Sequence, residues 1–378
     1  MVRGAVALAV MACLALAAPA AADKSSPRPK PVVIAVEGPI TGSRSSTGTD
    51  MVSGVRLAIK QVNARGGVLG RPVRLIQVDD RAEADRAKTV ARRAIRRRPV
   101  AVIGPYNSSV GIANLPVYLR HRVVPVHLTS SDETKGMGVT VQPKTSQIAP
   151  VESAFITRTG AKKVTMLVDD GPDGAFAVGM ATRLRNRLAR RGVEVSWISV
   201  AEPADASDDF YVTKVAEAVA TQPDLLYVST YAPQGVKIAE ALVAGGGSTP
   251  CLMGLGNVSP DFIASARLQA AERCKFSGVP AAAQLPSARA FTRQYRRVFS
   301  AEPGVWGVFA FDSANTLFRA MKKAGTTRFT PVLHELRHTR GYRGATGTIT
   351  IDPATGYRQT LPISILSVST DHKFVIAR

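Results

Sequence analysis

Short apolar runs alternate with longer amphipathic stretches along most of this chain. The run at residues 32–36 is followed by a stretch in which Val55, Ala58, Ile59 and Val62 recur at the spacing of one helix face. Solid apolar strands that alternate with amphipathic helices are typical of parallel sheets with helices on both faces. The pattern therefore predicts an α/β fold.

The alternation runs in two series, and the second begins after Pro150. We expect strands at residues 31–36, 73–78, 100–103, 123–128, 163–168, 193–200, 225–228, 251–253 and 275–279. Among the expected helices, one starts at Thr49, and others cover residues 110–121, 235–244, 260–273, 287–299, 306–323 and 331–339. Residues 348–351 and 362–368 read as a hairpin across the turn 353–356. Two successive series predict two doubly wound parallel-sheet lobes.

The composition is that of a core-forming protein with an excess of positive charge. The chain has 378 residues, is 45% hydrophobic and carries a formal net charge of +21. Such an apolar fraction excludes a disordered chain, and the length suits two domains. The charge alone would favour a nucleic-acid partner.

The N-terminus changes that interpretation. Residues 1–22 combine Arg3, an apolar run at 4–18 and small residues before a cleavage point after Ala22, which is the pattern of a secretory signal peptide. The run is shorter than the roughly 20 residues that span a bilayer. We expect export to the periplasm or cell envelope, which argues against a nucleic-acid partner. A lipid anchor at Cys13 is an alternative form of attachment.

Two cysteines, Cys251 and Cys274, remain after the predicted cleavage. An even number of cysteines in an exported chain indicates one disulfide. A pair of buried free thiols is the alternative.

One motif suggests a metalloenzyme. His334, Glu335 and His338 match the H-E-x-x-H pattern, in which two histidines bind zinc and the glutamate acts as general base. However, the position of a third histidine falls on Gly344, and no glutamate follows Glu335 in the chain. We therefore favour an ordinary amphipathic helix over a zinc metallopeptidase and expect no metal site and no catalytic residues.

Other tempting patterns also have simpler interpretations. The arginines within residues 92–98 lie opposite an apolar helix stripe and without interleaved aromatic residues, as on a solvated helix face. The glycine-rich stretch at 38–43 lacks the spacing of a dinucleotide or phosphate loop. We expect neither a nucleic-acid surface nor a cofactor.

Polar residues gather where the predicted strands end, which is where open α/β sheets bind ligands. In the first series these residues are Tyr106 to Ser109 and Thr129 to Ser131; in the second they are Asp169 to Asp173, Thr230-Tyr231 and Gly254 to Asn257. Hydroxyls and free amides at helix N-termini suit a carboxylate. The sequence thus favours a small-molecule ligand.

The chain resembles the solute-binding proteins of ABC importers, of the branched-chain amino-acid (Leu/Ile/Val) binding type. The resemblance rests on residues 34–42, on 54–70 with its Gly66-Gly67-x-x-Gly70 ending, and on Asp79-Asp80, 102–105, 311–314 and 344–347. It extends over essentially all of the chain after the signal peptide.

The resemblance implies a type I periplasmic-binding fold with two lobes joined by a three-strand hinge. It places the first lobe at 31–146 and 282–351 and the second at 147–281 and 352–378. The implied function is capture of a small ligand and delivery to an ABC permease by a monomer, without catalysis. A ligand-sensing receptor component on the same fold is the alternative.

The resemblance also implies site residues. Ser108, Thr129 and Ser131 match positions that hold the ligand's carboxylate and ammonium, and Tyr231 matches a covering tyrosine; Tyr106 and Ser130 flank these positions in the same loops. The acidic partner of the ammonium would fall near Gly256, which has no side chain. We expect either that Asp173 supplies the missing charge or that the ligand has no ammonium.

Overall fold

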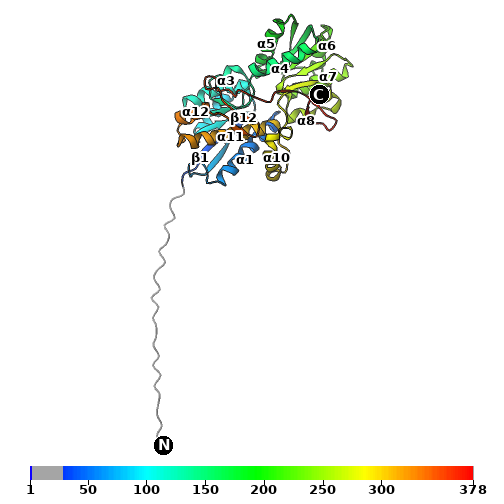
Figure 1. The fold of residues 1–378 in the computed structure, drawn as a ribbon. Helices are drawn as coiled ribbons and strands as arrows, with labels where there is room; N and C mark the ends of the chain where they lie inside the picture. Colours follow the sequence, from blue (N-terminus) through cyan, green and yellow to red (C-terminus); the bar gives the residue numbers. More distant parts are fainter. Residues whose placement is uncertain (2–28, 378) are drawn as a thin grey trace.

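The computed structural model describes Met1 and residues 29–377. Apart from Met1, the predicted signal peptide at 1–22 and its Cys13 lie outside the described residues. The chain from residue 30 onward folds into two lobes, each built around its own sheet (Figure 1). No helix among the described residues is long and apolar enough to cross a membrane.

The first lobe contains a five-stranded parallel sheet in the order β2-β1-β3-β4-β5. Its strands are β1 Val32–Gly38, β2 Val73–Asp79, β3 Ala101–Ile103, β4 Val124–His127 and β5 Val139–Thr140. Successive side chains point to opposite faces of a strand. Ile34 therefore joins the core on one face, whereas Ala35 joins the core on the other.

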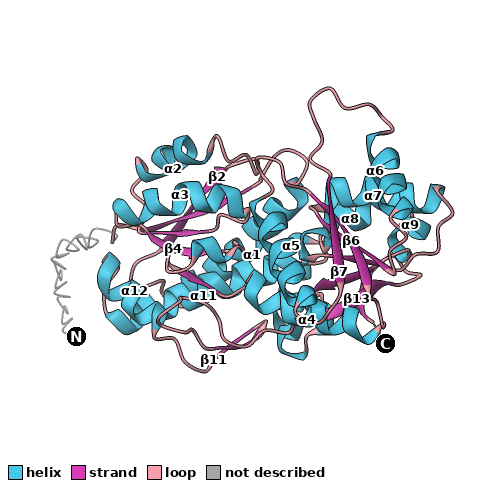
Figure 2. Cartoon of the chain, turned by 90° about the horizontal axis from the view of Figure 1, so that it is seen from above, coloured by secondary structure: helices cyan, strands magenta, loops and turns pink. Residues whose placement is uncertain are grey.

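Helices cover both faces of this sheet (Figure 2). On one face lie α1 Ser45–Asn63, α11 Val305–Ala324 and α12 Phe329–Arg337. On the other lie α2 Ala87–Ile95 and α3 Ser108–Arg120. The lobe also carries η1 Asp132–Thr134, α10 Arg289–Phe299 and a small antiparallel pair, β11 Tyr342–Gly344 and β12 Gly347–Ile349.

The second lobe contains a seven-stranded sheet in the order β14-β13-β10-β9-β8-β6-β7. Its strands are β6 Lys163–Val168, β7 Glu194–Ser199, β8 Leu225–Ser229, β9 Cys251–Met253, β10 Lys275–Gly278, β13 Ser364–Val368 and β14 Phe374–Ile376. The strands from β6 to β10 are parallel, whereas β13 and β14 form an antiparallel edge. Its helices are α4 Thr145–Arg158, α5 Ala175–Ala189, α6 Phe210–Ala220, α7 Ala232–Ala244, α8 Pro260–Ser265 and α9 Leu268–Glu272.

The chain passes between the lobes three times. The crossings lie between β5 and α4, between β10 and α10, and between β12 and β13. The second crossing carries two short 3-10 turns, η3 Ala282–Gln284 and η4 Pro286–Ala288. The α/β class with two sheet lobes is the one that the strand–helix alternation predicted.

The predicted pairing of residues 348–351 with residues 362–368 is wrong, although the predicted turn between them forms. Strand β12 pairs with β11, and β13 pairs with β10 of the second sheet and with β14. The turn at 353–356 reverses the chain beside β5, with Ile351 bridged to Arg358, and the third crossing continues from there to β13. Local alternation identified extended segments but assigned them the wrong partners.

The predicted helix at 260–273 is also wrong, because it is two helices. Residues Ala266 and Arg267 adopt extended backbone between α8 and α9. The backbone N–H of Arg267 donates to Glu240 of α7 at 2.9 Å, and the Arg267 guanidinium binds the same carboxylate. This tertiary contact takes a backbone group that a continuous helix would use.

The cysteine pair predicted from the chain forms one disulfide in the structure, between Cys251 and Cys274. It connects β9 to the residue just before β10, two strands that are neighbours in the second sheet. Both cysteines are buried.

A buried carboxyl group attaches α4 to the second sheet. Glu152 accepts hydrogen bonds from Tyr227 on β8, at 3.1 Å, and from Ser277 on β10. Burial raises the pKa of Glu152 from its usual 4.5 to about 7. The folded chain therefore binds a proton that the unfolded chain releases between these two pH values.

This pKa predicts a pH-dependent stability. Because the folded pKa is raised, the contribution of Glu152 is full below pH 4.5 and is lost as the pH rises through about 7. This loss should be absent in Glu152→Gln. Between pH 4 and pH 8, the free energy of unfolding of wild type should therefore fall by about 3 kcal/mol relative to that of the variant. Urea unfolding at several pH values measures the difference. The exposed Glu272→Gln is the matched control, and parallel profiles for wild type and Glu152→Gln would contradict the prediction.

Candidate functional site

A small cavity lies between the lobes, at the carboxyl ends of the strands of both sheets. Its water-accessible volume is about 10 Å³, which is about the space of one water molecule and far below the roughly 300–1,000 Å³ of sites for drug-sized ligands. Its nine lining residues are all buried: Tyr106, Ser108, Ser130, Gln142, Phe176, Tyr231, Leu255, Gly256 and Trp306. The position agrees with the rule that open α/β sheets bind ligands beyond the carboxyl ends of their strands.

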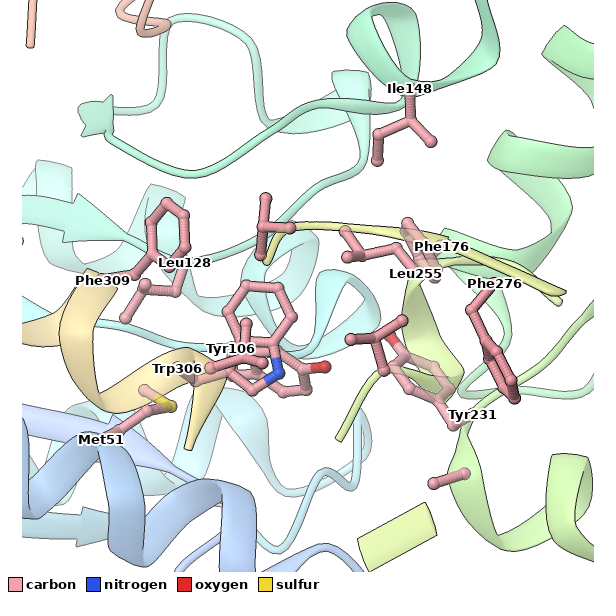
Figure 3. Packing of buried hydrophobic residues seen from close by; sticks show 14 of the residues in the cluster. Met51, Tyr106, Leu128, Ile148, Phe176, Tyr231, Leu255, Phe276, Trp306 and Phe309 are labelled. Atoms are coloured by element: carbon pink, nitrogen blue, oxygen red, sulfur yellow. The ribbon is translucent and has the colours of Figure 1, made fainter. Parts of the chain in front are cut away.

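Aromatic side chains from both lobes form the walls of the cavity. Tyr106 follows β3 and packs against Trp306 of α11, with ring centroids 5.1 Å apart. Tyr231 follows β8 and packs against Phe176 of α5 at 5.8 Å. The two pairs meet where Tyr106 and Tyr231 lie edge to face at 6.4 Å (Figure 3). Closing the lobes therefore brings four rings around one small space.

Two serine hydroxyls give the cavity its polarity. Ser108 is the first residue of α3, and its Oγ accepts a hydrogen bond from the backbone N–H of Ser131 at 3.1 Å. The Oγ of Ser130 accepts one from Nε2 of Gln142 at 2.9 Å. A hydroxyl that accepts a bond still has its own proton to donate. Together with the N-terminal amides of α3, the two serines make this side of the cavity rich in donors, which suits a carboxylate.

Arg44 adds positive charge next to the cavity. Its guanidinium lies 3.8 Å from the centroid of the Tyr231 ring, so a first-lobe cation stacks on a second-lobe aromatic. The Nε and Nη1 atoms of Arg44 are buried without a hydrogen-bond partner. Burial raises the pKa of Tyr231 to about 12, so its hydroxyl keeps its proton at neutral pH.

Several hydrogen bonds connect the lobes outside the cavity. Ser46 of α1 donates to Asp261 of α8. The backbone N–H of Ala84 donates to Asp173 at 3.0 Å. The backbone N–H of Ala175 donates to Ser109 at 3.3 Å. These bonds hold the lobes in a closed arrangement.

The structure brings four of the predicted site residues to the cavity and places three elsewhere. Tyr106, Ser108, Ser130 and Tyr231 line it. The Thr129 hydroxyl instead bonds to His127 Nδ1 at 2.9 Å and to Thr134 Oγ1 at 2.7 Å. The Ser131 hydroxyl accepts from the N–H of Glu133, and Asp173 makes the contact between the lobes described above.

The loop after β4 explains the difference. Successive residues of an extended segment point in opposite directions, so Thr129 and Ser131 share one side and Ser130 the other. The resemblance assigned Thr129 and Ser131 to the ligand, with Ser130 as a flanking site residue, whereas Ser130 is the residue of the three that lines the cavity.

Four further lining residues were missed: Gln142, Phe176, Leu255 and Trp306. Leu255 lies within the loop 254–257 that the sequence had identified, and Phe176 follows the loop 169–173, so the signal was present for these two. Gln142 lies at the first crossing, and Trp306 comes from a distant part of the chain at the start of α11. Only the tertiary fold brings the latter pair to the site.

The H-E-x-x-H motif occupies a surface position. His334 and His338 are exposed and stack with ring centroids 4.1 Å apart, and Glu335 pairs with Lys323 at 2.6 Å. Within residues 29–377, no group of three or more His, Cys, Asp or Glu side chains is arranged to hold a metal ion. The motif lies at the end of the amphipathic helix α12, and His338 is the residue that follows the helix.

Comparison with known proteins gives consistent results. The model of the family described as periplasmic binding protein matches residues 31–373. A Leu/Ile/Val-binding protein, BraC3, of Rhizobium johnstonii is 26% identical over 217 residues, which cover 56% of this chain and 58% of the relative. The leucine-, isoleucine-, valine-, threonine-, and alanine-binding protein of Pseudomonas aeruginosa is 23% identical over 312 residues, 81% of this chain and 82% of the relative.

The fold is found in solved structures as well. The leucine binding protein LivK of Thermotoga maritima superposes with a TM-score of 0.82 at 24% identity, over 92% of this chain and 98% of the other. The matched stretches span about half the length of the first curated relatives.

Proposed function

The chain belongs to the periplasmic binding protein family, and from this premise we propose that it captures an amino acid or a related small carboxylate or amide between its lobes. The cavity between the lobes carries this proposal, since it combines a donor-rich side with an aromatic wall. The role is binding and not catalysis. The related proteins named for branched-chain amino acids support the class of ligand.

We assign the carboxylate of the ligand to Ser108, Ser130 and the N-terminal amides of α3. Both serines lie in the cavity with a proton free to donate. The ligand's apolar part would lie against Tyr106, Phe176 and Trp306. Tyr231 closes the cavity from the second lobe.

The two lobes, 31–146 with 282–351 and 147–281 with 352–378, move in this proposal as rigid units about the three crossings. Opening breaks the contacts between the lobes and admits the ligand, and closing encloses it. The exported protein then delivers its ligand to the permease of an ABC importer.

A thermal-shift screen of the chain without its signal peptide, against amino acids, amides and small carboxylates, tests binding. A ligand that binds the folded state selectively raises the melting temperature by mass action, so at least one class should give a concentration-dependent increase. Uptake of that ligand by cells with and without the protein then tests transport. Binding without an uptake defect would indicate a sensing role, and no shift with any class would contradict the proposal.

A further inference from the structure

The lining of the cavity contains no acidic side chain. Its polar members are two serines, two tyrosines, a glutamine and a tryptophan, and its other members are apolar or glycine. An ammonium group buried there would have no opposite charge to pair with. Burying an unpaired charge is costly, so ligands with such a group should be disfavoured.

The backbone at Gly256 prevents an acid at that position. A Cβ atom added to Gly256 would lie 2.3 Å from the carbonyl oxygen of Thr230. Real Cβ atoms do not approach backbone so closely, so any side chain at this position would require the loop to move. The packing of the loop after β9 therefore leaves no room for an acidic side chain at position 256.

Three acidic residues lie near the cavity without lining it. Asp173 accepts the bond from Ala84, and Asp261 accepts bonds from Ser46 and from Thr47. Asp169 accepts from the N–H of Gly171 at 3.3 Å, burial raises its pKa, and its charge lies near Arg44 and Tyr231. None of these side chains lines the cavity.

The unpartnered polar atoms around the cavity include both donors and acceptors, and the buried Asn107 next to Ser108 has one of each. Trp306 Nε1 is buried without a hydrogen-bond partner in the lining, and Arg44 Nε and Nη1 are likewise unpartnered beside Tyr231. In the lining, Oε1 of Gln142 is the unpartnered acceptor, and it is uncharged. It can accept from a hydroxyl without compensating a full positive charge.

We propose that the cavity selects a small carboxylate that carries no ammonium group, such as a simple carboxylic acid or its hydroxy derivative. This inference rests on the proposed function and narrows its ligand class. The donors face the carboxylate, Arg44 adds a positive charge beside Tyr231, and Gln142 accepts from a hydroxyl on the neighbouring carbon. Amino acids of the same size are rejected because their ammonium has no partner.

Two matched series test the inference by calorimetry on the chain without its signal peptide. Leucine, leucic acid and isocaproic acid differ only in an ammonium, a hydroxyl or a hydrogen on one carbon. Phenylalanine, phenyllactic acid and phenylpropionic acid form the corresponding aromatic series. In whichever series binds, the two members without ammonium should bind at least tenfold more tightly than the amino acid.

An amino acid that binds as tightly as its matched acids would overturn the inference while leaving the proposed function intact. If no member of either series binds but the thermal-shift screen finds an amide, the inference fails and the binding role stands. If nothing binds in either experiment, the proposed function fails as well.

A gain-of-charge variant provides an independent measurement. Gln142→Glu places a carboxylate in the cavity and should shift the affinity ratio of amino acid to matched acid at least tenfold toward the amino acid. The control is Gln269→Glu, which makes the same change of charge at an exposed position on α9 and should leave the ratio unchanged. An unchanged ratio in folded Gln142→Glu would contradict the inference.

Discussion

Ser130→Ala is expected to weaken carboxylate binding about 10- to 100-fold, whereas Ser131→Ala should leave the affinity nearly unchanged. The hydroxyl of Ser130 lines the cavity and has a proton free for the ligand, and a hydrogen bond to a charged group contributes about 1.5–3 kcal/mol. The hydroxyl of Ser131 instead accepts from the N–H of Glu133. Combining Ser108→Ala with Ser130→Ala should reduce the affinity more than 100-fold, since two donors to the same carboxylate are lost.

The neighbouring serines make this a matched comparison, because both substitutions remove one hydroxyl from the same loop. Titration calorimetry with the ligand found in the thermal-shift screen measures the affinities. Circular dichroism checks that each variant is folded, and Ser131→Ala should lose about 1 kcal/mol of stability with its lost cap. Equal losses of affinity in the two variants would contradict the assignment of Ser130 to the ligand.

Asp312→Ala is expected to lower the free energy of unfolding by about 3–5 kcal/mol. Asp312 is fully buried in α11 and accepts hydrogen bonds from the backbone of Ala345 at 2.8 Å and from the backbone and hydroxyl of Thr346. The nearby buried Arg358 bonds to the same Thr346. Alanine at position 312 leaves three buried donors unsatisfied beside a buried cation, and each such donor costs about 1–3 kcal/mol.

Urea unfolding at neutral pH measures this effect. Asp371→Ala removes a carboxylate from an exposed position and should change the stability by less than about 0.5 kcal/mol. The ligand affinity of folded Asp312→Ala should be close to that of wild type, because Asp312 does not line the cavity. A stability loss no larger than that of the control would contradict the prediction. It would show that the hydrogen bonds of Asp312 do not stabilise the turn at Ala345 and Thr346, between β11 and β12.

The same contact explains why the sequence could reveal the family before it revealed the site. Residues 311–314 and 344–347 are two of the segments that carry the resemblance, and Asp312 of the first binds Ala345 and Thr346 of the second. They are recognisable because they build the scaffold. The fold could be predicted from such segments and from the solid apolar strands, since these patterns follow from burial alone.

The side of a loop that faces the ligand could not be predicted in the same way. The sequence places Thr129, Ser130 and Ser131 together at the end of a strand, but their orientation depends on distant partners. Lys144 is buried beneath the loop and donates to the carbonyl of Thr129 at 3.1 Å and to Thr134 at 2.8 Å. These contacts fix the backbone of Thr129 and the Thr134 hydroxyl to which the Thr129 hydroxyl bonds, and they depend on how the first crossing packs.

Strand partners and helix breaks also could not be predicted from the sequence alone. The pairing of β13 with β10 joins residues nearly ninety positions apart, and the break between α8 and α9 depends on Glu240 of another helix. Neither segment has a glycine or proline that marks the difference. The local sequence pattern indicates which residues are extended or helical. Contacts with distant residues determine which strands pair and where a helix ends.

The hydrogen bonds between the lobes, such as those of Asp261 and Asp173, affect the affinity of the protein for its ligands but not its preference among them. They form whenever the lobes close, so they set the population of the closed conformer, and the apparent affinity for every ligand scales with that fraction. Substitutions at these contacts would shift all dissociation constants by a common factor and leave their ranking unchanged. Over evolution, affinity could thus be adjusted to the solute concentration of a habitat at residues outside the cavity, while the cavity keeps its preference.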